Sequence, residues 1–320
     1  MLRNLLFSAV LLVLLNACAP GAKQKTTPAN DSNIETATEP AKEQPLIPAD
    51  LQPASLNDLP AIQNGGFVLQ PGFYEAEFRT YCLQPGTPDP SPRDAYLQAP
   101  MTGYRKEIIQ TVLNNSRLKP EIPQKNVQLL LWNIVSGSDF DKLSPTVKSD
   151  AARLLNSKQI FELRGGVVGL MKNVAYNIPG SSGNDIRRLF DLGNSTYEMY
   201  ERMAVLRQPS QLRRPDFKND QWYKQKQSYY VRHFPVSYQK VKIQVYVPDG
   251  LLDSTNKVNG EYLVFDPTGY QTIPANSNAQ RLGIGGPMVD IIRKVIIINN
   301  PGNGNPKKIE PRNPKGKPAA

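Results

Sequence analysis

Residues Phe73–Leu83 read FYEAEFRTYCL, and this stretch decides the fold class. Its side chains alternate between two faces, one with Tyr74, Ala76, Phe78 and Thr80 and the other with Phe73, Glu75, Glu77 and Arg79. A period of two is typical of a β-strand. The stretch Val236–Val247 shows the same alternation, with Val241, Ile243, Val245 and Val247 on one face. We therefore expect strands on both sides of the chain's centre.

Helical periodicity fills the region between these strands. The pattern predicts helices over Gly103–Leu118, Gln124–Val135, Ser144 to about Leu155, Ser157–Arg164 and, as one long helix, Asp185–Leu206. Ser144-Pro145 has the form of an N-cap followed by proline at the first helical position. Shorter strands are expected over Gly66–Gln70, Glu261–Phe265 and Asp290–Ile298, and Gly283–Gly286 is interpreted as a turn.

The order strands, helices, strands predicts an α+β fold rather than alternating βαβ units. We expect the N- and C-terminal strands to form a β-sandwich or barrel-like sheet, with the helical segment at the centre of the sequence. The globular body is predicted over residues 61–298. Residues 18–60 are poor in bulky apolar side chains and predict a disordered tether, and residues 299–320 predict a basic, disordered Pro/Gly/Lys tail.

Residues 1–17 have the form of a signal peptide, with Arg3 before an apolar run that is short for a membrane span. The sequence Leu15-Asn16-Ala17-Cys18 resembles the bacterial lipobox. That resemblance implies cleavage before Cys18, a diacylglyceryl thioether on its sulfur and an acyl chain such as palmitate on its amine. Ala19 in place of Asp favours the outer membrane by similarity to enterobacterial sorting. The alternative is an ordinary secretory signal with an incidental cysteine.

The composition excludes several classes of site. The chain of 320 residues has a formal charge of +10, one histidine and two cysteines. A histidine-based zinc site and a disulfide scaffold each need more of these residues. A Ser-His-Asp triad would depend on His233, which we interpret instead as a strand or loop residue with a satisfied hydrogen bond. Asp185, Asp191, Glu198 and Glu201 are interpreted as solvated charge on one helix. We expect no cofactor, no metal and no conventional enzyme.

Cys82 is the only thiol in the predicted body, because Cys18 belongs to the lipobox. An odd cysteine in an exported protein needs an explanation. It can be a small buried hydrophobe that is inert, or it can form an intermolecular disulfide. Its neighbours suggest a third role.

Tyr81-Cys82 ends the first strand, and Gln128 precedes Trp132 by four positions in the helix predicted from Gln124. These two segments together resemble the thioester domains of Gram-positive surface adhesins, over about residues 73–137. Val127, Leu130 and Leu131 depart from the residues usual in that family, and no wall-sorting signal is present. The resemblance implies a bond between the Cys82 thiol and the Gln128 acyl group, with Tyr81 and Trp132 in support.

The chemistry explains these residue types. A cysteine thiol attacks the side-chain amide carbon of a glutamine, ammonia leaves, and the resulting thioester is a stored electrophile. A primary amine on a target then forms an amide bond and releases the thiol. The fold must hold sulfur and carbonyl in reactive geometry and keep water out.

Two functions from different classes follow. The first is a surface-anchored lipoprotein of the outer membrane that captures amines covalently, such as lysine side chains or polyamines, as an adhesin does. The alternative is a non-covalent structural or binding lipoprotein of the cell envelope in which Cys82 is buried and inert. The basic, aromatic stretch Arg207–Arg232 would suit anionic glycan or lipid, or it is a solvated face with packing aromatics. Nucleic acid is not an expected partner of an envelope lipoprotein.

Overall fold

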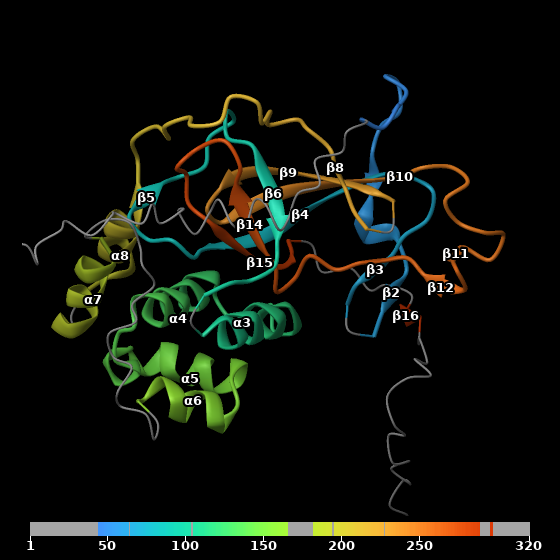
Figure 1. Ribbon diagram of the computed structural model, residues 1–320. Coiled ribbons are helices and arrows are strands. Elements are labelled where there is room, and N and C mark those ends of the chain that lie inside the picture. Colours follow the sequence, from blue (N-terminus) through green and yellow to red (C-terminus); the bar gives the residue numbers. More distant parts are fainter. Residues whose placement is uncertain are drawn as a thin grey trace, which may run out of the picture.

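The computed structural model describes residues 44–63, 65–103, 105–165, 182–193, 195–226, 228–288 and 295–296. The predicted signal peptide, Cys18 and the tail at 299–320 lie outside these residues, as does most of the predicted tether. The described chain has an α+β fold with a barrel-like sheet (Figure 1).

A closed antiparallel barrel of six strands is the centre of the fold (Figure 1). Each strand pairs with the next, and the last pairs back with the first, in the order β4 (Gly72–Cys82), β10 (Lys240–Val247), β9 (Tyr230–Ser237), β6 (Tyr96–Ala99), β14 (Gln271–Pro274) and β15 (Leu282–Pro287). The barrel closes through short contacts, because β6 pairs with β9 only where Tyr96 stands opposite His233, and β15 pairs with β4 between Phe78 and Cys82. This closure brings the C-terminal strand β15 beside Cys82.

The alternation that decided the fold class corresponds to the observed strands. Val241, Ile243, Val245 and Val247 are all completely buried. They stand opposite Phe78, Ala76, Tyr74 and Gly72 of β4. The predicted strand Val236–Val247 was wrong at its start, because residues 238–239 form the turn between β9 and β10.

Shorter strands extend the barrel and surround it. β1 (Ala54–Ser55) lies parallel to β4, and β8 (Tyr223–Lys224) pairs with β9. A second sheet has the order β13 (Val264–Phe265), β3 (Phe67–Val68), β2 (Ala61–Ile62) and β16 (Val295–Ile296). Two-stranded pairs join β5 (Thr87–Pro88) to β7 (Val205–Leu206) and β11 (Lys257–Val258) to β12 (Glu261–Tyr262).

The folded body begins before the predicted boundary at Ala61. β1 pairs with β4, and Leu56, in the 3₁₀ turn η1 (Leu56–Asp58), is completely buried. The apolar residues of this segment pack into the core one at a time. They have no periodic spacing, so the sequence pattern did not predict that the segment is folded.

The helices of the described chain lie on one side of the barrel (Figure 1). They are α3 (Lys106–Leu118), α4 (Gln124–Ser136), α5 (Pro145–Leu154), α6 (Ser157–Leu163), α7 (Ser182–Leu192) and α8 (Tyr197–Ala204), with a 3₁₀ turn η2 (Phe140–Lys142). The Ser144 hydroxyl accepts a hydrogen bond from the Val147 N–H, so the predicted N-cap is confirmed. The single helix predicted over Asp185–Leu206 was wrong, because Gly193 has a φ of 70° and separates α7 from α8.

Helices α3 and α4 pack directly on the barrel, α3 against β15 and α4 against β4 (Figure 1). The interpretation of Gly283–Gly286 as a turn was wrong, because these residues lie in β15. A Cβ on Gly285 would lie 2.8 Å from the Tyr81 ring, and one on Gly283 would lie 2.9 Å from the Leu113 side chain of α3. Gly283 and Gly286, where a Cβ would lie 3.0 Å from Arg117 Cα, therefore allow the close approach of α3, and Gly285 leaves space for the Tyr81 ring.

No helix of the described residues is both long and apolar enough to cross a membrane.

Candidate functional site

Gln128 of α4 and Cys82 at the end of β4 contact one another through a pair of hydrogen bonds. The Cys82 backbone N–H donates to Gln128 Oε1 at 2.8 Å. Gln128 Nε2 donates to the Cys82 carbonyl oxygen at 3.0 Å. The fold thus brings the Gln128 side chain onto the backbone of Cys82, although 46 positions separate the two residues in the sequence.

The end of β10 explains why the helix can make these contacts. The pairing of β10 with β4 ends where Lys240 stands opposite Arg79, so the last residues of β4 have no strand on that side. Gln124 and Gln128 are one helical turn apart and face this edge. Gln124 Nε2 donates to the carbonyl oxygens of Thr80, at 3.1 Å, and Gln239, at 2.9 Å. Glutamine side chains replace a neighbouring strand here.

Both partners are shielded from water. Cys82 is 0% exposed and Gln128 is 1% exposed. Burial raises the pKa of the Cys82 thiol to about 12, so the thiol is protonated at neutral pH. Cys82 is also the only free cysteine within the part of the chain that the structure describes.

Trp132 forms the wall of the site one helical turn beyond Gln128. Its ring is completely buried and stacks on Tyr197, with ring centroids 5.7 Å apart, and on Tyr238, with centroids 6.4 Å apart. Its indole N–H is close enough to the Cys82 sulfur to oppose part of the rise in the thiol pKa. This contact is not a hydrogen bond, because Trp132 Nε1 has no hydrogen-bond partner among the described residues.

Tyr81 is placed differently from the other three residues. It neighbours Cys82 in β4, and successive side chains of a strand point to opposite faces. Its ring lies beside Gly285 of β15, and its hydroxyl interacts with Ser116 of α3. Tyr81 therefore anchors the strand end from the opposite face and does not line the contact between Cys82 and Gln128.

The sequence analysis missed a polar network beside Trp132. Tyr197 of α8 and Tyr238 of the turn between β9 and β10 share a hydrogen bond of 2.9 Å between their hydroxyls. The Tyr238 hydroxyl also donates to Glu201 Oε1 at 2.8 Å. No sequence signal marks these residues, because the tyrosines come from two elements that only the fold brings together.

His233 does not have the satisfied hydrogen bonds that were expected. It lies in β9, is 1% exposed, and neither ring nitrogen has a hydrogen-bond partner among the described residues. Burial lowers its pKa to about 3, so the imidazole is neutral. His233 stands opposite Ile243 of β10 and Tyr96 of β6. It is a buried barrel residue.

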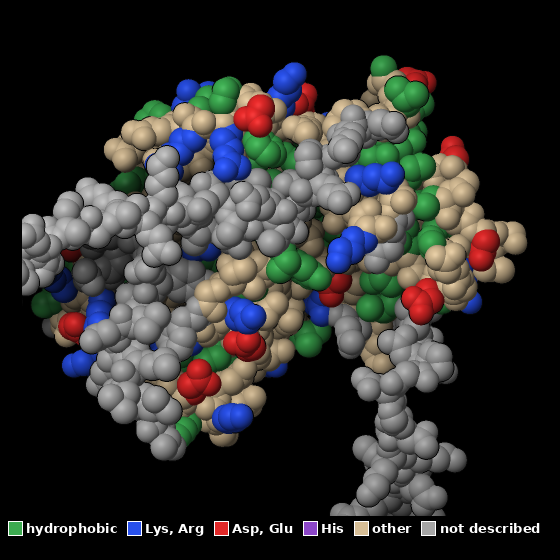
Figure 2. Space-filling view, viewed as in Figure 1, with side chains coloured by type: hydrophobic (Ala, Val, Ile, Leu, Met, Phe, Trp, Pro, Cys, Tyr) green, Lys and Arg blue, Asp and Glu red, His purple; other side chains and the backbone are tan. Residues whose placement is uncertain are grey.

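The aromatic residues of Arg207–Arg232 serve packing. Trp222, Tyr223, Tyr229 and Tyr230 are all buried. The Arg232 guanidinium lies 4.2 Å from the centroid of the Trp222 ring. On the visible described surface in Figure 2, cationic and anionic side chains are interspersed rather than gathered by sign. The aromatic residues of this stretch therefore contribute to packing.

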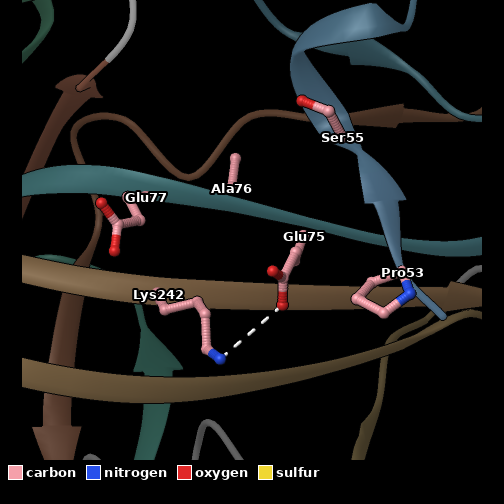
Figure 3. Close-up of a pocket in the computed structure, with 6 residues that line it drawn as sticks. All are labelled: Pro53, Ser55, Glu75, Ala76, Glu77 and Lys242. Atoms are coloured by element: carbon pink, nitrogen blue, oxygen red, sulfur yellow. Dashed lines mark ion pairs between the residues drawn. The ribbon is translucent and has the colours of Figure 1, made fainter.

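A pocket of about 290 Å³ lies beside the first half of β4, between this strand and the β1 segment (Figure 3). It is lined by Pro53, Ser55, Glu75, Ala76, Glu77 and Lys242. Its charges are already matched, because Lys242 pairs with Glu75 at 3.7 Å and Lys240 pairs with Glu77 at 2.9 Å. Cys82 is five residues beyond Glu77, roughly 16 Å along an extended strand, so this pocket is separate from the cysteine site.

The acidic residues predicted on one helix lie on two. Asp185 and Asp191 belong to α7, whereas Glu198 and Glu201 belong to α8. Within the described ranges, no group of three or more potential ligand side chains could hold a metal ion.

The hydrogen bond to Gln128 Oε1 has a chemical consequence. A donor on a carbonyl oxygen draws electron density from the carbonyl carbon and stabilises the negative charge that develops when a nucleophile adds to it. The carbon in question is Cδ of Gln128, and the residue that supplies the donor also carries a thiol. The site thus has an acyl group, a polarising N–H, a thiol and a dry wall.

Comparisons with protein-family models, with curated proteins and with solved structures give no match to this chain.

Proposed function

We propose that Cys82 and Gln128 form an internal thioester with which the protein captures amines covalently. In the forming step, Cys82 Sγ bonds to Gln128 Cδ, the bond from Cδ to Nε2 breaks, and the thiol proton leaves with the nitrogen as ammonia. The product is an acyl group that is stored in the fold.

The observation that carries this proposal is the two-way hydrogen bonding between the Gln128 amide and the Cys82 backbone. It fixes the amide carbon beside the residue that bears the thiol. Positioning of this kind contributes up to roughly 7–11 kcal/mol to an intramolecular reaction. The Cys82 N–H remains available to the carbonyl oxygen after ammonia leaves, so one of the two bonds supports both reactant and product.

Burial supports the second half of the proposal, the survival of the thioester. Cys82, Gln128 and Trp132 are each at most 1% exposed. A site that excludes water protects a reactive acyl group from hydrolysis. In the capture step, the amine nitrogen bonds to Cδ, the bond between Cδ and Sγ breaks with its electron pair going to sulfur, and one amine proton ends on the thiol.

One observation favours the non-covalent alternative, in which Cys82 is inert. Gln124 uses the same kind of side chain on the same strand edge, and its bonds serve only to satisfy the carbonyls of Thr80 and Gln239. In this alternative, Gln128 likewise serves only to pair the backbone N–H and carbonyl of Cys82, one helical turn further along. The two readings differ in whether the amide nitrogen of Gln128 is retained.

We also propose that the protein is a lipoprotein anchored in the outer membrane through acyl chains on Cys18. The proposal rests on the lipobox sequence and the signal peptide before it. Several acyl chains on one residue give stable anchoring, whereas one chain is marginal. The mass of the N-terminal peptide from the membrane fraction tests it, and an unmodified Cys18 would contradict it.

Methylamine labelling tests the thioester. Wild-type protein incubated with methylamine should gain one methylamide at Gln128, mapped by peptide mass spectrometry, together with one free thiol at Cys82. The Cys82→Ala variant should gain none. Gln124→Ala is the matched control: it removes a glutamine from the same helix face and should still be labelled at Gln128. Wild-type protein that stays unlabelled even after mild loosening with denaturant would support the inert cysteine instead.

A further inference from the structure

A chain of hydroxyl groups runs from the wall of the site towards the surface. Tyr197 and Tyr238 both stack on Trp132, and their hydroxyls lie 2.9 Å apart. Tyr238 is 2% exposed, whereas the Glu201 side chain at the end of the chain is 25% exposed. The network therefore joins a buried site to a carboxylate that water reaches.

The hydrogen bonds have a definite direction. Glu201 is an acceptor, so the Tyr238 hydroxyl donates to it, at 2.8 Å. Gln239 Nε2 donates to the Tyr238 oxygen at 2.9 Å. A hydroxyl has one proton, and the Tyr238 hydroxyl donates its proton to Glu201. In the bond between the two tyrosines, the Tyr197 hydroxyl is therefore the donor and the Tyr238 oxygen is the acceptor. Protons can pass from Tyr197 to Tyr238 and on to Glu201 without reorienting the side chains.

Trp132 connects the inner end of the chain to the cysteine, because its ring stacks on Tyr197 with centroids 5.7 Å apart and its side chain interacts with the Cys82 thiol. Tyr197 and Cys82 interact electrostatically, and this interaction contributes to a raised pKa of Tyr197, after burial as the main cause. Cys82 itself is surrounded by apolar groups, with the Trp132 indole as its polar neighbour on this side. A sulfur in such surroundings is a poor leaving group unless a proton can reach it.

Other charged groups hold the outer end in place. Arg207 donates to Glu201 at 2.9 Å and to Asp89 at 2.8 Å, and Asp89 accepts from the Tyr238 backbone N–H at 2.9 Å. The remaining charged groups around the network are Lys125 over the Tyr197 ring, Glu198 paired with Lys125, and Arg281, which interacts electrostatically with Cys82. None of them interrupts the bonds from Tyr197 to Glu201.

We propose that Tyr197, Tyr238 and Glu201 form a proton relay for the amine-capture reaction at Cys82 and Gln128. This inference rests on the proposed thioester. As the amine nitrogen bonds to Gln128 Cδ, it gives a proton to the Tyr197 oxygen, the Tyr197 proton moves to Tyr238, and the Tyr238 proton moves to Glu201. The pair of electrons from the bond between Cδ and Sγ stays on sulfur. The reverse transfer then protonates the sulfur, so the net change is one proton from amine to thiol.

The test is the rate at which preformed thioester reacts with methylamine, followed by intact mass in Tyr238→Phe and Glu201→Gln. Positioned acid–base groups contribute about 10²–10⁴-fold, so we expect each variant to react at least about 10²-fold more slowly. Tyr200→Phe is the matched control: Tyr200 lies on the same helix and is 5% exposed, but its hydroxyl donates to the Leu189 carbonyl outside the relay. It should react as the wild type does.

A second nucleophile separates a relay from a packing role. Hydroxylamine is an uncharged, strongly nucleophilic amine at neutral pH and needs little help in losing a proton. The relay predicts that Tyr238→Phe slows methylamine far more than hydroxylamine. Equal slowing of both nucleophiles would show a structural role and overturn the relay, as would wild-type rates with methylamine.

The two proposals fail differently. Absence of thioester from the wild type would refute the proposed function itself. Thioester present in the wild type, with Tyr238→Phe and Glu201→Gln reacting normally, would refute only the relay. If the variants fold but never lose ammonia while Tyr200→Phe does, the relay serves thioester formation as well, since that step also moves the thiol proton to nitrogen.

Discussion

At the residue scale, two glutamines of one helix differ in what they touch. Gln124 donates to two carbonyl oxygens, so its own carbonyl oxygen takes no part in those bonds. Gln128 donates and also accepts, and the donor is the N–H of the cysteine. This second bond pairs the Cys82 N–H at the strand edge, as a neighbouring strand would, and it also polarises the acyl carbon of Gln128.

At the same scale, we predict that His233 makes the stability of the protein depend on pH. Burial lowers its pKa to about 3, whereas an exposed histidine titrates near 6.5. Between these values the unfolded chain binds a proton that the folded chain does not, so this residue makes the free energy of unfolding fall as pH decreases from about 6.5 to about 3. The slope from one group is at most about 1.4 kcal/mol per pH unit.

Urea unfolding of the wild type and of His233→Leu over this pH range checks the prediction. The variant should lose less stability on acidification, because its core residue cannot bind a proton. It should also be at least as stable near neutral pH, since no hydrogen-bond partner of the imidazole is lost. Parallel pH profiles for the two proteins would show that His233 is not buried as a neutral base.

At the element scale, the local pattern predicted the pieces of the site but not its arrangement. The alternation in β4 and the apolar periodicity of α4 gave both elements close to their observed ends, because each pattern depends on burial of one face. The contact of Cys82 with Gln128 was anticipated only through the family resemblance. Tyr197 and Tyr238 were missed because a long-range stack leaves no local pattern.

Replacement of Gln124 tests how α4 and β4 are joined. Gln124→Ala removes two hydrogen bonds and leaves the Thr80 and Gln239 carbonyls without those donors. A lost donor to a largely buried carbonyl costs about 1–3 kcal/mol, so thermal unfolding should occur at a lower temperature. The variant should nevertheless retain the helix, by circular dichroism. An unchanged unfolding temperature would mean that these bonds do not fasten the helix to the strand edge.

At the scale of the whole molecule, barrel closure builds the site from distant parts of the chain. β15, with Leu282 opposite Cys82, closes the barrel on one side of β4, and α4 covers the other side where β10 has ended. The glycines of β15 give no strand signal, because Gly283 and Gly286 admit α3 and Gly285 leaves space for the Tyr81 ring. Sequence periodicity therefore could not predict that β15 pairs with β4, although it did predict the α+β class.

The same closure explains why a reactive group could persist in this protein. Cys82 ends β4 and Gln128 lies in α4, which packs on β4, so both residues are buried between the barrel and a helix. Trp132 and the two tyrosines stacked on it cover the site from the side of α8.

The most direct measurement is the intact mass of freshly purified, unlabelled protein that includes residues 44–296, compared with its Cys82→Ser variant. The account predicts that the wild type is lighter than its sequence mass by one ammonia and shows no free thiol at Cys82, whereas the variant has its full sequence mass. A wild type with its full mass, and with a thiol at Cys82 that reacts quantitatively once the protein is unfolded, would contradict the thioester.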